Sequence, residues 1–359
     1  MKIIYSVFLL VFTCCSIILH AQFSVSGKII DSASGDPLPG ASVYCHNTTI
    51  GTASNKQGEF SLQMKAGGYD LIVTYTDYQT RLIRVSSDTS NLIIPMVKQE
   101  KNMAEIVIRS SNEVTDGWEK YGSFFVEHFI GATPNAALCK IENPEVLKFY
   151  FYKKSNKLKV LADTPLIIEN KALGYNLRYE LDSFVYYYTT DINSYRGYCL
   201  YSEMEGTDQE KRTWEANRKK AYYGSKLQFM RSYYDSTLTE DGFTIDLLDE
   251  NDSTKFDKVN DPYDTAYYSG LDDSTTEIEI WYPRKISVSY LKKRPEPEYI
   301  KKFGLPKNVA SQISYVDLND AIAIKENGYY YDQRDWVNQG YWSWKNLADQ
   351  LPYDYEPPE

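Results

Sequence analysis

The stretch VSGKIIDSASGDPLPGASVYCHNTTIGTASNKQGEFSLQMKAGGYDLIVTYTDYQT, residues 25–80, decides the fold of the first part of the chain. Short segments with alternating apolar and polar residues are separated by turns rich in Gly, Pro, Asn and Asp, a pattern typical of an all-β domain. We expect about seven strands in a sandwich over residues 22–98. The positions expected in its core are Val25, Gly27, Ile29, Ala41, Val43, Cys45, Phe60, Leu62, Met64, Leu71, Val73 and Tyr75.

Two motifs in this stretch resemble those of the carboxypeptidase-regulatory-like domain family: D-x-x-x-G-x-P-L-P-G-A-x-V at residues 31–43 and G-x-F-x-L at residues 58–62. The resemblance implies a transthyretin-like β-sandwich that serves as a rigid accessory unit in exported bacterial proteins and has no chemistry of its own. FFVEHFIG, PLIIENKALGY, WEANRKKAYYGS and GYWSW, at residues 124–131, 165–175, 214–225 and 340–344, are similar to the body of exported proteins that carry this first domain. That second resemblance implies a shared architecture and no activity.

Residues 1–21 are typical of a signal peptide. Lys2 supplies a positive start, the segment from Ile3 to Leu19 is largely apolar, and Ala21 ends a cleavage site. The alternative is a retained anchor, but the apolar run is shorter than the ~20 residues that a spanning helix needs. We therefore predict export to the periplasm or the outer-membrane periphery, with no transmembrane helix in the mature chain.

Length and charge limit the remaining possibilities. The 359 residues favour two domains, with a polar linker at residues 99–115 and a β-rich α+β domain at residues 116–359, built from an antiparallel sheet with packed helices. A formal net charge of −10 argues against nucleic-acid binding.

Apolar spacing predicts the main elements of the second domain. A helix is expected over residues 114–130, and a long strand over residues 175–189. Thr207 and Glu210 form a capping-box pattern at the start of another helix. We expect that helix to lay an apolar stripe, Tyr223, Leu227, Met230 and Tyr234, on the sheet. The strand is expected to bury Tyr175, Leu177, Tyr179, Leu181, Val185 and Tyr187 on one face.

The metal-binding motif of a zinc carboxypeptidase is absent from the sequence. His46 and His128 are followed three residues later by Thr49 and Gly131, whereas the motif requires H-x-x-E. We expect no metal and no cofactor, and we expect His46 on the surface. His128 with Cys139 is a weak nucleophile pairing, and a packing role for His128 is preferred.

Cysteine count allows one disulfide at most after the signal peptide. Cys45, Cys139 and Cys199 remain, and Cys139 with Cys199 is the pairing we expect if a disulfide forms, although sequence does not determine connectivity.

Two charged features remain as candidate sites. Glu203 and Glu205 are two residues apart on a predicted strand that also carries Tyr201, so a glycosidase carboxylate pair is conceivable, with solvated surface acids as the preferred interpretation. The segment Lys211–Arg231 is basic and would contact anionic lipid headgroups or an acidic partner, or neutralise the protein's own acidic sheet, which we favour. We assign no catalytic residue.

The sequence leaves three classes of function open. A non-enzymatic interaction or assembly module of the envelope ranks first, because it requires only export, the accessory sandwich and an aromatic β-rich body. A carbohydrate-binding module with aromatic platforms and a glycoside hydrolase are the alternatives.

Overall fold

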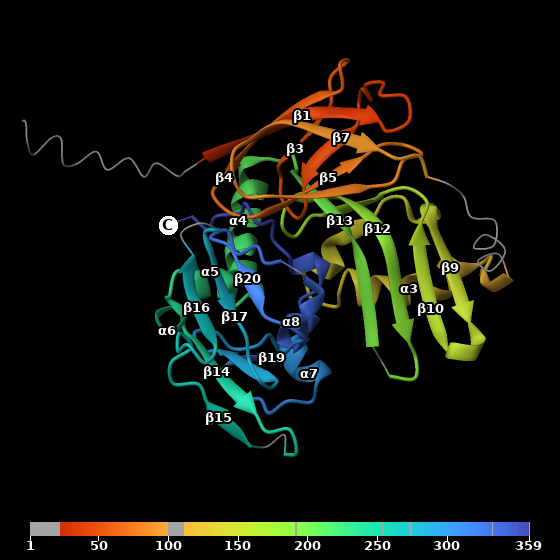
Figure 1. Ribbon diagram of the computed structural model, residues 1–359. Helices are drawn as coiled ribbons and strands as arrows, with labels where there is room; N and C mark the ends of the chain where they lie inside the picture. The colour runs from red at the N-terminus through yellow and green to blue at the C-terminus, as the bar shows by residue number, and fades with distance from the viewer. Residues whose placement is uncertain are drawn as a thin grey trace, which may run out of the picture.

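The computed structural model describes residues 22–99, 111–190, 192–252, 255–272, 275–331 and 333–358. The predicted signal peptide at residues 1–21 and most of the predicted linker at residues 99–115 lie outside this part of the chain. Buried apolar side chains gather in three clusters, one in the first sandwich and two in the remainder. The first sandwich lies across both other parts, as Figure 1 shows.

Seven strands form the first sandwich, as the alternation predicted. One sheet has the order β4-β1-β7 and the other β3-β2-β5-β6. Gly58 closes the turn before β4 with φ +76°, a conformation that favours glycine, which explains the first residue of the G-x-F-x-L motif. The strands are β1 Gln22–Asp31, β2 Ser42–Cys45, β3 Gly51–Ala53, β4 Glu59–Lys65, β5 Tyr69–Thr74, β6 Arg81–Val85 and β7 Thr89–Met96.

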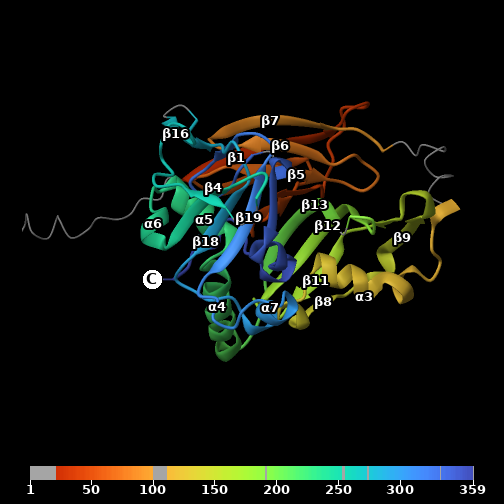
Figure 2. The same cartoon turned by 90° about the horizontal axis from the view of Figure 1, so that it is seen from below.

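A six-stranded antiparallel sheet, here called the middle sheet, follows. Its longest strand, β12 (Tyr175–Tyr187), pairs with β11 and then β10 along one edge and with β13 along the other. Helix α3 (Gly117–Phe129) lies over one face of the sheet (Figure 2). Its buried residues Phe125 and Phe129 pack in the same cluster as the sheet. The other strands are β8 Cys139–Ile141, β9 Leu147–Tyr152, β10 Lys157–Ala162, β11 Leu166–Asn170 and β13 Ile192–Glu203.

The alternation predicted for β12 holds only as far as Leu181. The pairing register with β13 shifts between Leu181 and Ser183, and a bulge of this kind reverses the faces of all residues beyond it. Tyr186 is therefore buried and Tyr187 is 40% exposed, so the predicted burial of Val185 and Tyr187 on the face of Tyr175 is wrong.

Two further sheets form the last part of the chain, here called the C-terminal body. Their orders are β15-β14-β18-β19-β21 and β16-β17-β20. The strands are β14 Phe243–Leu248, β15 Phe256–Lys258, β16 Tyr268–Asp272, β17 Glu277–Ile280, β18 Ile286–Tyr290, β19 Gln312–Leu318, β20 Ile322–Ile324 and β21 Trp336–Gly340. The helices that follow the middle sheet in the chain are α4 Asp208–Tyr222, α5 Lys226–Tyr234, α6 Leu238–Asp241, α7 Pro297–Lys302 and α8 Tyr341–Trp344. Short 3₁₀ turns occupy Ala136–Leu138, Pro144–Val146 and Lys153–Ser155 in the part with the middle sheet, and Gln333–Asp335 and Leu347–Asp349 near the end of the chain.

The helix predicted from Thr207 is two helices. The capping box is present at its start, where the Thr207 hydroxyl accepts from the Glu210 amide and the Glu210 carboxylate accepts from the Thr207 amide. Gly224 then adopts φ +87°, and Ser225 caps a new helix, α5. Met230 packs in the C-terminal body and Tyr223 is 37% exposed, so the predicted stripe on the middle sheet is wrong.

Cys45, Cys139 and Cys199 are free thiols, which contradicts the expected Cys139–Cys199 pairing. Cys139 lies on β8 and Cys199 on β13, with β11 and β12 between them. Burial raises the pKa of the Cys45 and Cys139 thiols to about 12, so both stay protonated near neutral pH.

Within the described ranges, no helix combines the length and the apolar character needed to cross a membrane.

Candidate functional site at the junction of the three parts

The turn that follows β2 joins the first sandwich to the middle sheet. The Asn47 amide donates to the Cys199 carbonyl at 2.7 Å, and the Tyr201 amide donates to the Thr48 carbonyl at 2.9 Å. Thr48 forms a parallel bridge with Leu200, so this turn adds a short strand to the edge of β13. Asn47 has φ +55°, a conformation that Asn adopts more easily than most residues.

His46 is buried at this contact, so the expectation of a surface His46 is wrong. It is 9% exposed, its ring lies edge-on to Tyr198, and its Nδ1 accepts from the Cys199 amide at 3.1 Å. Burial lowers the pKa of His46 to about 4. The alternation of β2 pointed outward, but the outward side of this strand faces the middle sheet and not solvent.

His46 makes stability depend on pH. Its pKa is about 4 in the folded protein and about 6.5 in an unfolded chain, so the unfolded chain binds more protons between these values. The free energy of unfolding therefore includes a contribution from neutral His46 that is complete above pH 6.5. This contribution, about 3 kcal/mol in total, is lost as the pH falls toward 4. His46→Asn keeps an acceptor near Nδ1 but does not titrate.

Urea unfolding of the wild type and the His46→Asn variant from pH 7 to pH 4 measures this dependence. The free energy of unfolding is expected to fall more steeply in the wild type. Parallel curves for the two proteins would contradict the burial of His46 at this contact.

The end of the described chain fastens all three parts together. The Tyr353 amide donates to the Asn47 carbonyl at 2.7 Å, and the Thr49 amide donates to the Asp354 carboxylate at 3.0 Å. Arg231 of α5, 7% exposed, donates to the carbonyls of Tyr353 and Tyr355, each at 2.9 Å. No motif in the sequence predicts this role, and the aromatic residues Tyr353 and Tyr355 between Pro352 and Pro357 were the available signal.

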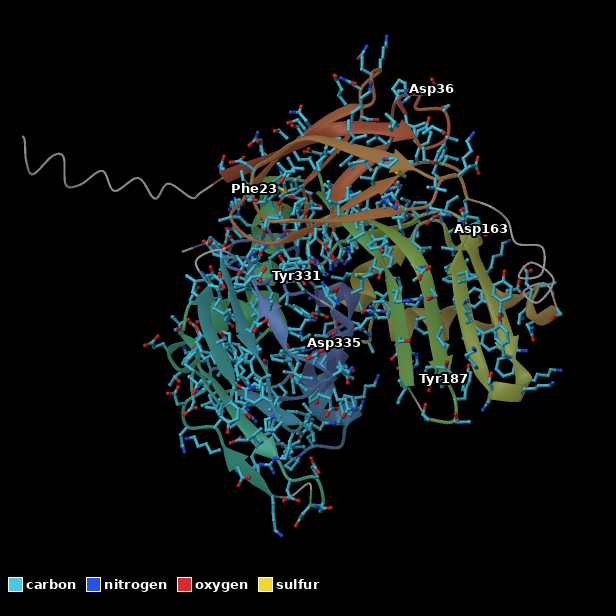
Figure 3. All side chains as sticks on the ribbon, viewed as in Figure 1. Phe23, Asp36, Asp163, Tyr187, Tyr331 and Asp335 are labelled. Atoms are coloured by element: carbon cyan, nitrogen blue, oxygen red, sulfur yellow. The ribbon has the colours of Figure 1, made fainter. Side chains whose placement is uncertain are left out.

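A second contact joins the first sandwich to the C-terminal body. The Asn327 side chain accepts from the Gly68 amide at 3.2 Å and donates to the Gly68 carbonyl at 3.0 Å. The Arg84 guanidinium lies 4.2 Å from the centre of the Tyr331 ring, and Figure 3 shows Tyr331 on the side of the C-terminal body that faces the sandwich. A Cβ on Gly68 would come within 2.7 Å of Lys325 and Tyr329, so this contact requires glycine.

A pocket of about 400 Å³ opens beside the junction. Arg218 of α4 lies 3.8 Å from the centre of the Tyr175 ring, and its guanidinium donates to the Glu203 carboxylate at 2.8 Å. The same guanidinium donates to the carbonyls of Leu173 and Gly174. The lining residues are Thr49, Tyr175, Glu203, Met204, Lys211, Trp214, Glu215, Arg218, Pro352, Asp354, Tyr355, Glu356 and Pro358.

The structure separates the three residues of the suggested sugar site. Glu203 is the last residue of β13 and lines the pocket, Glu205 lies beyond the strand, and Tyr201 is 1% exposed. Tyr201 therefore has no free face for stacking on a sugar ring. Glu203 is bonded to Arg218, and the described residues contain no group of three or more His, Cys, Asp or Glu placed to hold a metal.

Much of the basic segment Lys211–Arg231 serves the fold. Arg218 and Arg231 bind backbone carbonyls, and Lys226 donates to the Tyr330 hydroxyl at 2.8 Å. Burial lowers the pKa of Lys226. Lys211, Arg212 and Lys220 of α4 are exposed, so the cationic surface is smaller than the sequence suggested.

His128 and Cys139 are each bonded to their own surroundings. His128 Nδ1 lies 2.8 Å from the Phe124 carbonyl, and the Cys139 thiol donates to the Asn135 carbonyl at 3.4 Å. These contacts favour the packing interpretation over a nucleophile pair.

Comparison with known proteins gives a match for the first part of the chain. No curated protein matches. Among solved structures, a streptococcal ancillary pilin is 16% identical over 22% of this chain and 30% of its own length, with a TM-score of 0.20. The C-terminal domain of the shaft pilin SpaA from Lactobacillus rhamnosus GG is 15% identical over 22% and 99%, with a TM-score of 0.19.

A DUF3823 family protein from Bacteroides ovatus is 11% identical over 52% of this chain and 83% of its own, with a TM-score of 0.18. Likenesses of this size do not identify a common fold. A family model, in contrast, matches residues 25–108. The matching family is the CarboxypepD_reg-like domain, which confirms the resemblance indicated by the motifs at residues 31–43 and 58–62.

Proposed function

We propose that the protein is a non-enzymatic interaction or assembly protein of the bacterial envelope, exported by its first 21 residues. In this proposal the regulatory-like domain is fixed to the middle sheet and the C-terminal body, and the three parts present one rigid surface to other envelope components. The observation that carries the proposal is the junction itself. The turn after β2 bonds to β13 on one side and to Tyr353 on the other, so the domain is built into the body and is not a tethered attachment.

The bonding of the acidic residues at the junction supports this function over hydrolysis. A glycosidase needs two carboxyl groups that are free to exchange protons or attack a sugar. Glu203 is held by Arg218, and both Asp354 oxygens accept from the Thr49 amide. Either carboxylate would have to give up these bonds before it reacted.

The distribution of tyrosines also supports an interaction protein over a carbohydrate-binding module. Among the largest side chains that are less than 2% exposed are seven tyrosines, including Tyr175 and Tyr201. Among the described residues, Tyr187, Tyr188, Tyr223 and Tyr315 are 37 to 40% exposed. Tyr187 and Tyr188 adjoin at the end of β12, whereas Tyr223 follows α4 and Tyr315 lies on β19. Most of the ring surface is thus used for packing, where burial contributes stability.

Two measurements test the proposal. The first is the mass of the mature N-terminus after expression in a Gram-negative host, together with fractionation of the cells. We expect a chain that begins at Gln22 in the periplasmic or envelope fraction, because the charge and apolar pattern of residues 1–21 are those of a cleaved leader. An intact Met1 in the cytoplasmic fraction would overturn the envelope assignment.

The second measurement is the release of reducing ends from envelope and plant polysaccharides by the purified protein. We expect no release above that of heat-denatured protein. Release that is lost in Glu203→Gln and kept in the matched variant Glu205→Gln would overturn the non-enzymatic assignment and identify Glu203 as a catalytic residue.

A further inference from the structure

The end of the middle sheet that lies away from the first sandwich carries a row of amphipathic side chains that are half-buried or exposed. The cross-strand register places Tyr152, Lys157, Tyr187 and Ile192 side by side on β9, β10, β12 and β13. Figure 3 shows Tyr187 at this far end. Ile192 is 59% exposed and Tyr187 is 40% exposed, so the row presents apolar and aromatic surface to solvent. We call this row, with the turn residues Lys153, Lys154 and Tyr188, the sheet tip.

The sheet tip is basic in an acidic protein. Residues 147–162 contain five lysines and no acidic residue, while the whole chain has a net charge of −10. Lys153 and Lys154 are exposed in the turn between β9 and β10. In the sequence of the other turn, residues 188–191, Asp191 is the one acidic residue. The three lysines of the sheet tip therefore outnumber the acidic residues of the two turns.

Contacts within the sheet tip hold the cationic and aromatic groups together. The Lys157 ammonium lies 4.8 Å from the centre of the Tyr152 ring and 5.7 Å from that of Tyr187. The Tyr188 amide donates to the Asn156 carbonyl at 3.1 Å, which joins the two turns. Tyr188 is 37% exposed. The two turns therefore form one connected surface and not two independent loops.

We infer that the sheet tip docks the protein on the headgroup region of an anionic phospholipid bilayer. Lysines near such a surface are attracted to its negative potential. Tyrosine rings favour the boundary between headgroups and acyl chains. Insertion of an exposed isoleucine at the same depth is also favourable, because its apolar surface leaves water. The sheet tip consists of two neighbouring strand turns at the end of the sheet. Such a convex shape can enter a membrane interface more readily than it can enclose a ligand.

The charge of the remaining protein orients this docking. Because the chain as a whole is acidic, an anionic membrane repels most of its surface and attracts the sheet tip. The first sandwich then faces away from the bilayer. This surface is separate from the junction, and the inference extends the proposed function without depending on the bonds described there.

Cosedimentation with extruded vesicles tests the inference. Every described helix and strand lies at or after Gln22, so protein without residues 1–21 is used and the apolar segment from Ile3 to Leu19 does not contribute to binding. We expect binding to vesicles of phosphatidylcholine with about 30% phosphatidylglycerol, weakened by added salt because the attraction is electrostatic. Binding to pure phosphatidylcholine vesicles that equals binding to the anionic vesicles would overturn the inference.

Variants locate the surface. Lys153→Gln, Lys154→Gln and Lys157→Gln together are expected to lower the partition coefficient at least about tenfold, since each lysine contributes roughly a fivefold factor near an anionic surface. Tyr188→Ser with Ile192→Ser is expected to lower it about tenfold through lost apolar burial. The matched control Lys219→Gln with Lys220→Gln on α4 is expected to change binding by less than about twofold.

Two results would contradict the assignment. Loss of vesicle binding in the α4 control, with binding kept in the triple variant, would move the membrane contact to α4. Retention of the wild type on an anionic polysaccharide, lost in the triple variant and without any vesicle binding, would show that the tip binds a glycan. Thermal unfolding of each variant separates a binding defect from a folding defect.

Discussion

Arg231→Met is expected to lower the free energy of unfolding by about 3 to 5 kcal/mol. Arg231 is 7% exposed and donates to the carbonyls of Asn327, Tyr353 and Tyr355. Met has similar length but no donor, so three carbonyls lose their partner and each unpaired buried group is costly. The final segment would also lose its main attachment to α5.

Arg212→Met is the matched control for this change, because Arg212 lies on the exposed side of α4 and its recorded bond is to Gln209 at 3.1 Å. Arg212→Met is expected to lower the free energy of unfolding by less than about 0.5 kcal/mol. Urea denaturation of both variants measures the contrast. Equal stability of the two variants would mean that the final segment is not held by Arg231.

Phe229→Ala is expected to lower the free energy of unfolding by about 3 to 5 kcal/mol, because it removes a large buried ring. Phe229 is fully buried, and its ring centre lies 5.3 Å from that of Trp342 and 5.4 Å from that of Phe243. These neighbours belong to the C-terminal body. The change therefore tests the placement of α5 there.

Tyr223→Ala provides the comparison, because Tyr223 belongs to the stripe expected from the sequence but is 37% exposed after the end of α4. It is expected to cost less than about 1 kcal/mol. A single helix on the middle sheet would instead make Tyr223→Ala the more costly change, and thermal or urea unfolding distinguishes the two arrangements.

The local features of the fold could be predicted from the sequence. Turn glycines and strict alternation specify the first sandwich, and Thr207 with Glu210 specifies the start of α4, because each depends on neighbours within a few residues. The break at Gly224 was harder to predict, since an isolated glycine inside an apolar stripe is compatible with a continuous helix. The bulge in β12 left no separate mark in the sequence.

The junction could not be predicted, because it depends on pairing between distant segments. His46 alternates outward on β2, and only the docking of the first sandwich on β13 makes that side buried. Glu203 and Arg218 meet because α4 packs beside the turn before β12. The sequence contains both residues but gives no indication that they are bonded. Glu203 and Glu205 were therefore a plausible site in sequence, whereas in the fold Glu203 forms an ion pair with Arg218.

The central claim is that the regulatory-like domain is built into the body through the turn after β2. Hydrogen exchange at the amides of Asn47, Cys199 and Tyr201 tests it most directly, because these amides donate across the contact. We predict exchange as slow as that of amides inside β12. Rapid exchange at all three, with the cores of the sandwich and of the middle sheet still protected, would contradict a fixed junction and mean that the domain moves freely on its body.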